Sequence, residues 1–150
     1  MKSFLQSVAC IVYVLIGALS VSAASVHFVK GPTFVDAGTQ LVTSGKLAGL
    51  GEGDITVIVN ASGLADVECT NPGGNVAPGQ QTAVSASGSV TLPSAKNGHL
   101  VFSVATETPT VPDYPTCPNP QWSASVVDVT FTGGTITVVQ GGAIVLQEAF

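Results

Sequence analysis

The stretch ITVIVNASGLADVECT, residues 55–70, decides the fold class. Every second residue in two parts of it is apolar: Ile55, Val57 and Val59, then Ala65, Val67 and Cys69. A side-chain repeat of two is typical of a β-strand that buries one face. We therefore expect two short strands here, with the sequence between them near a strand end.

The same alternation recurs along the chain, from about residue 26 to residue 146, and predicts eight or nine short strands. Glycine pairs at 133–134 and 141–142 resemble tight hairpin turns, and Asn97-Gly98 is a further turn signal. No segment has the repeat of a helix. Strands of this kind must bury their apolar faces together. We predict an all-β fold, an antiparallel β-sandwich of Ig-like or Greek-key type, with a barrel as the alternative.

The first 23 residues have the pattern of a signal peptide. Lys2 supplies a positive start, an apolar run covers about residues 8–19, and Val21-Ser22-Ala23 offers small residues for cleavage. The apolar run is short for a membrane span of about 20 residues. We expect cleavage after Ala23, or after Ala24, and secretion of residues 24–150 as a single β-sandwich domain.

The charge pattern excludes several partners. Without Lys2, three lysines and no arginine stand against nine carboxylates, which gives a net charge of −6. So few cations cannot neutralise a phosphate backbone. We therefore expect no nucleic-acid partner and no membrane partner after signal cleavage.

Cysteine usage predicts one disulfide. Cys10 leaves with the signal peptide, so Cys69 and Cys117 form an even pair in an oxidising compartment. The bond closes a long loop, for which the chain-entropy model gives about 4 kcal/mol of stabilisation. Two cysteines without nearby His or Cys partners do not make a zinc site. We predict no metal and no cofactor.

Two long loops, residues 70–81 and 107–121, interrupt the strands and carry or flank the candidate binding residues. The second, around TPTVPDYPTCPNPQW (residues 108–122), holds five prolines, a tyrosine and the only tryptophan. Long loops in compact domains are often functional, and a disulfide would bring these two to one end of the molecule. An alternative is that Trp122 packs in the core at a strand start. The candidate binding residues are two aromatics and five amides: Tyr114, Trp122, Asn71, Asn75, Gln80, Gln81 and Asn119.

Catalytic patterns are sparse. The chain has no G-x-S-x-G motif, and His27 and His99 lack the context of a catalytic base. Asp66 and Glu68 lie two residues apart on one strand face, a separation of about 6–7 Å that suits a glycoside hydrolase. Alternate acidic residues are more often a solvated face. The serine row at 85, 87 and 89 is likewise expected to be a solvated strand face, with a polymer- or ice-binding array as the alternative.

Asn60-Ala61-Ser62 is a glycosylation sequon, so a glycoprotein is expected in a host that glycosylates.

Several segments give the chain a resemblance to known proteins. They are VHFVKGPTF (26–34), KLAGLGEGDITV (46–57), CTNPGGNVAPGQ (69–80), CPNPQW (117–122) and DVTFTGGTITV (128–138). With these the chain resembles a group of small secreted proteins of filamentous fungi and some actinobacteria. The resemblance implies an extracellular protein, and in a fungal host an effector or elicitor. It implies no catalytic residues.

Together these observations predict a secreted, non-enzymatic protein that acts by surface recognition at a host or microbial cell surface, as an effector or elicitor in virulence. Its expected partner is a host or microbial surface protein or a neutral polysaccharide. The alternatives are a module that binds cell-wall polysaccharide, a small glycoside hydrolase and a structural coat protein.

Overall fold

The structure is a computed structural model that describes residues 25–93 and 97–150, so the predicted signal peptide lies outside it. The described residues form eight strands and one four-residue helical turn. Their bounds are β1 His27–Asp36, β2 Leu41–Ala48, β3 Ile55–Thr70, β4 Val76–Pro78, β5 Thr82–Leu92, β6 Leu100–Ala105, α1 Asp113–Thr116, β7 Ser123–Gln140 and β8 Ala143–Ala149. The all-β prediction is confirmed.

The strands form two antiparallel sheets. The small sheet has the order β1-β2-β6, and in the large sheet β3 lies between β7-β8 on one side and β5 with β4 on the other. In chain order, β1, β2 and β6 take the places of immunoglobulin strands A, B and E, while β3, β7 and β8 take those of C, F and G. The sandwich is therefore Ig-like in strand order. The exception is β5, which pairs with the edge of β3, whereas strand D of an immunoglobulin domain belongs to the other sheet.

The central strands are longer than the sequence suggested. Residues 55–70 form one strand of 16 residues, and β7 has 18, so the prediction of short strands is wrong. The alternation continues through the middle of β3 because the small residues Ala61 and Gly63 keep its inner face buried. A Cβ at Gly63 would lie 2.5 Å from the Thr130 carbonyl oxygen, so only glycine fits there.

The glycine pairs have different roles. Gly141-Gly142 joins β7 to β8 as predicted. Gly133-Gly134 forms no hairpin and lies inside β7, beside a register shift between Ser62 and Gly63 of β3. A second shift, between Asp66 and Val67, interrupts the alternation of β7. For this reason Val127, expected on the buried face, is 47% exposed.

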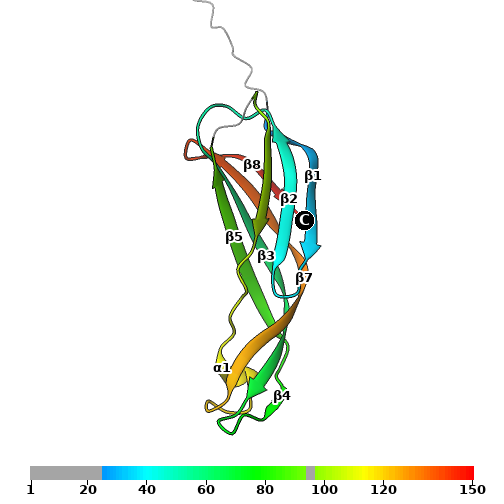
Figure 1. The fold of residues 1–150 in the computed structure, drawn as a ribbon, viewed down its shortest axis with the longest axis vertical. Coiled ribbons are helices and arrows are strands. Elements are labelled where there is room, and N and C mark those ends of the chain that lie inside the picture. The colour runs from blue at the N-terminus through cyan, green and yellow to red at the C-terminus, as the bar shows by residue number, and fades with distance from the viewer. Residues whose placement is uncertain (1–24, 94–96) are drawn as a thin grey trace, which may run out of the picture.

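The small sheet covers one half of the large sheet's inner face. Figure 1 shows β3, β5 and β7 running along the long axis of the molecule, with β1, β2 and β6 beside only the upper part. The core between the sheets contains residues from both: Leu47, Leu50, Ile55, Val57, Val59, Phe102, Val104, Ile136 and Val138. This arrangement leaves the lower half of β3 and β7 without a facing strand.

The proline-rich loop fills that place. The lower core consists of Ala65, Val67 and Val129, and Val111 of the loop packs against it. Pro109 of the same loop is buried. Part of the loop therefore substitutes for a missing strand by covering apolar side chains.

Candidate functional site

The disulfide fixes the lower end of the molecule. Cys69 is the penultimate residue of β3, and Cys117 directly follows α1. Their sulfurs are bonded at 2.01 Å, their Cα atoms lie 5.7 Å apart, and both side chains are buried. The predicted pairing is confirmed, and the bond ties the proline-rich loop to the central strand.

Further contacts join the two long loops, as predicted. The Gln80 backbone N–H donates to the Thr116 carbonyl of the second loop at 3.1 Å. The neighbouring Gly79 N–H donates to the Val67 carbonyl at 2.7 Å, which joins the first loop to β3. A Cβ at Gly79 would lie 2.9 Å from the Cys69 sulfur, so the approach of this loop to the disulfide requires glycine. Figure 1 shows α1 and β4 side by side at this end.

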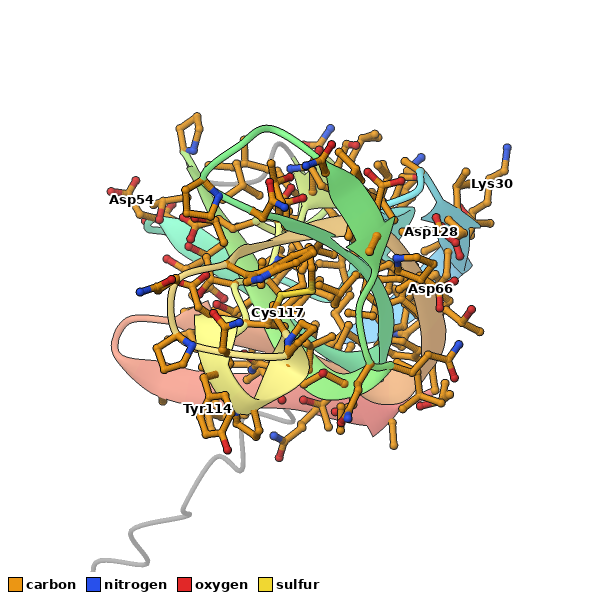
Figure 2. All side chains as sticks on the ribbon, turned by 90° about the horizontal axis from the view of Figure 1, so that it is seen from below. Lys30, Asp54, Asp66, Tyr114, Cys117 and Asp128 are labelled. Atoms are coloured by element: carbon orange, nitrogen blue, oxygen red, sulfur yellow. A yellow bond between two sulfur atoms is a disulfide. The ribbon has the colours of Figure 1, made fainter. Side chains whose placement is uncertain are left out.

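A hollow of about 490 Å³ lies between the two loops. We call this region the pinned tip; its lining residues are Pro78, Gly79, Gln80, Tyr114, Pro115, Thr116, Cys117 and Pro118. Tyr114 is 59% exposed, and Figure 2 shows its side chain pointing away from the body of the molecule. An exposed aromatic ring thus stands at the rim of a hollow whose wall is held by a disulfide.

Asp113 holds the turn that presents Tyr114. Its carboxylate accepts a hydrogen bond from the Ala124 backbone N–H at 2.7 Å, and its carbonyl accepts one from the Cys117 N–H at 2.8 Å. Within α1, Tyr114 has extended backbone angles of φ −122° and ψ 136°, so α1 is a kinked turn rather than a regular helix. The Tyr114 backbone is therefore fixed from both sides.

Most of the predicted amide side chains form hydrogen bonds with other groups of the protein itself. The Asn71 side chain accepts hydrogen bonds from the backbone N–H and the side chain of Asn75, which closes the first loop into a turn. Asn119 accepts from the Gln121 N–H at 3.0 Å, and Gln81 donates to the Asp66 carboxylate at 2.6 Å. Among the five amides, only Gln80 lines the hollow of the pinned tip.

Trp122 is half-buried, between the two alternatives that the sequence left open. Its backbone N–H donates to the Asn119 carbonyl at 3.2 Å. Unlike Tyr114, it does not line the hollow of the pinned tip. The two aromatics therefore do not form one platform in that hollow.

The two carboxylates of the hydrolase alternative lie on the outer face of β3. Asp66 and Glu68 both line a hollow of about 430 Å³ beside β4. Asp66 is also directly opposite Asp128 of β7, and Figure 2 shows these two close together in that view. A hydrolase with this pair stays a prediction, as does the absence of enzymatic activity.

Asn60 lies in the middle of β3, not near a strand end as predicted. It is exposed, opposite Ser87 of β5 and Thr135 of β7. Its neighbours on the outer face of the large sheet are uncharged, and they form rows across the strands: Ser85 and Ser62; Ser87, Asn60 and Thr135; Ser89, Ile58, Thr137 and Gln147. The serine row is exposed, as expected of a solvent face.

Other functional features are few in the part of the chain that the structure describes. No group of three or more His, Cys, Asp or Glu side chains lies together there in a way that could hold a metal ion. Over the same residues, no helix is long and apolar enough to cross a membrane.

Comparisons with known proteins give no further assignment. No family model, no curated protein and no solved structure matches the chain. The resemblance to secreted proteins of fungi and actinobacteria therefore stays a prediction.

Proposed function

We propose that the chain is a secreted, non-enzymatic recognition protein that binds a surface protein of a host or microbial cell through the pinned tip. The observation that carries this proposal is Tyr114, 59% exposed on a turn that the disulfide and Asp113 hold in place. Tyrosine is a frequent anchor of protein interfaces because it combines a large apolar area with a polar end. A fixed backbone lowers the entropy that is lost on binding.

Secretion is supported by two features. The sequence pattern of residues 1–23 is that of a signal peptide. The disulfide between Cys69 and Cys117 is of a kind that persists in oxidising compartments. Together with the resemblance to secreted fungal proteins, these features favour a role as an effector or elicitor.

Cell binding tests the pinned tip directly. We would label the oxidised protein and measure its binding to intact plant and fungal cells, with Tyr114→Ala beside Ile144→Ala. Ile144 is a matched control, since it is 62% exposed and lies on β8. Loss of an interface anchor costs about 2 kcal/mol or more, so Tyr114→Ala is expected to weaken binding about 30-fold.

Two outcomes contradict the proposal. Equal binding of Tyr114→Ala and the unsubstituted protein would remove the pinned tip as the site. Binding that survives treatment of the cells with protease would exclude a protein partner.

A neutral polysaccharide is the second candidate partner, and one observation favours it. The hydroxyl and amide rows around Asn60 extend over β5, β3, β7 and β8 without a charged side chain among them. Neighbouring strands are about 4.8 Å apart, so the exposed hydroxyl and amide groups of β5 and β3 offer hydrogen-bonding groups at regular intervals, whereas Thr137 of β7 is buried and accepts a hydrogen bond from Gln147. Retention on chitin, cellulose or β-glucan that is lost in Ser87→Lys with Thr135→Lys would support this candidate.

A further inference from the structure

Two lysines of the small sheet, Lys30 and Lys46, line one hollow, and this hollow shares no lining residue with the pinned tip. Lys30 of β1 is directly opposite Lys46 of β2, and both line a hollow of about 290 Å³. In regular antiparallel strands, directly opposite residues have Cβ atoms about 5 Å apart on one face, where like charges destabilise the pair. Here β1 shifts register on both sides of Lys30, and the shared hollow is what places the two lysines on one face. A chain with so few cations thus places two of them side by side.

Within the described residues, no carboxylate lines this hollow to offset its positive charge. Its lining residues are Lys30, Gly31, Thr33, Ser44, Gly45, Lys46, Val101 and Phe102, with no Asp or Glu among them. The strands β1, β2 and β6 together contain one carboxylate, Asp36, six residues beyond Lys30. The hollow is therefore a local positive site on an acidic protein.

The rest of the lining suits a polar ring. Thr33 donates to the Ser44 carbonyl at 3.2 Å, and the two hydroxyl oxygens lie 3.0 Å apart. The Ser44 hydroxyl then donates to Thr33, and both oxygens keep lone pairs that can accept hydrogen bonds from a ligand. Val101, 72% exposed, supplies an apolar wall, while Phe102, the other apolar lining residue, is buried in the core between the sheets. A Cβ at Gly45 would lie 3.0 Å from both the Phe102 ring and the Lys30 carbonyl oxygen, so a side chain does not fit at this position of the lining.

We propose that this hollow binds a single carboxylate-bearing sugar residue, a terminal acidic sugar of a glycan. The two ammonium groups would hold the carboxylate by charge-assisted hydrogen bonds, and Thr33 and Ser44 would contact ring hydroxyls. A volume of about 290 Å³ is at the small end of ligand pockets, which fits one ring rather than a chain. The net negative charge of the protein disfavours a polyanion but allows one carboxylate between two lysines.

The Lys30 side chain reaches outward from β1 into solvent (Figure 2). The ligand carboxylate would therefore bind at the open side of the hollow, and its affinity would fall as salt screens the lysines.

The test compares methyl glucuronide with methyl glucoside, which differ in the carboxylate alone. Titration followed by NMR should shift the amide signals of Gly31 and Gly45 with the glucuronide and not with the glucoside. Lys30→Gln and Lys46→Gln should each weaken binding about tenfold, since each removes a hydrogen bond to a charged group. Lys46→Arg should keep most of the affinity.

Ala143→Glu is the charge-matched control, because it lowers the net charge by one on an exposed residue of β8. It should bind the glucuronide like the unsubstituted protein. Three results would overturn the proposal: no shift with the glucuronide, equal shifts with the glucoside, or tighter binding of an acetylated peptide with a free C-terminal carboxylate. The last would assign the hollow to a peptide.

Discussion

The ring of Phe34 in β1 stacks on the ring of Phe150, with centroids 3.9 Å apart and planes inclined by 24°. Phe150 also exchanges two backbone hydrogen bonds of 3.1 Å with Gly134 of β7. These contacts tie the edge of the small sheet to the large sheet. Because the stack joins the two sheets, its loss should affect global stability and not only the chain end.

We predict that Phe34→Ala lowers the free energy of unfolding by about 2 kcal/mol, since both the aromatic pair and half-buried area are lost. Phe34→Leu should lose less because it keeps apolar area. Urea unfolding monitored by circular dichroism measures both. Equal stability of Phe34→Ala and the unsubstituted protein would show that the stack contributes nothing to sheet packing.

Removal of the disulfide should open the pinned tip before the upper core. Cys69→Ala with Cys117→Ala should cost about 4 kcal/mol, given a sequence separation of 48 between the cysteines. Hydrogen exchange should accelerate at the Gln80 amide, whose partner is the Thr116 carbonyl, while Val57 in the upper core keeps its protection. Unchanged exchange at Gln80 would mean that the loops hold together without the bond.

Gly88 is expected to be intolerant of a side chain. A Cβ there would lie 2.2 Å from the carbonyl oxygen of Ala105, where β5 approaches β6, and the neighbouring Ser87 carbonyl accepts the Glu107 N–H at 2.8 Å. Gly88→Ala must push two backbones apart, so we expect a loss of about 2–3 kcal/mol. Gly51→Ala is the control, because its nearest contact would be 3.6 Å. Similar melting temperatures for both variants would contradict the close approach.

The sequence predicts the fold class because alternation is a local property. Val57 and Val59 are both fully buried, as their spacing indicates, and the even cysteine pair identifies the disulfide. The length of a strand is harder to predict from the sequence. Asn60 and Ser62 look like a strand end by composition, but they continue β3 because β5 and β7 pair with both of their sides.

The candidate site was predictable only in part. The two long loops meet as expected, yet the side chains of Asn71 and Asn119 are engaged in local turns, which residue type alone does not show. The lysine hollow could not be inferred, because the pairing of Lys30 with Lys46 depends on register shifts in β1 on both sides of Lys30. The hydrophobic pattern and the turn geometry set the register of regular strands, but they do not indicate where such shifts occur.

The position of Asn60 leads to the last prediction. Its side chain is exposed at the centre of the large sheet's outer face, so a glycan there would extend over the hydroxyl rows. Expression in a glycosylating eukaryotic host should add the mass of one N-glycan, and Asn60→Gln should abolish the addition. Because an exposed substitution of this kind costs within about 0.5 kcal/mol, the folded state should be retained.

The same pair of proteins separates the two candidate binding surfaces. A glycan on Asn60 should block retention on a neutral polysaccharide, since the rows around it would be covered, while binding through Tyr114 at the pinned tip should persist. Asn60→Gln from the same host should restore any polysaccharide retention. If the glycosylated protein is retained as well as Asn60→Gln, the outer face of the large sheet is not the surface that contacts the polymer.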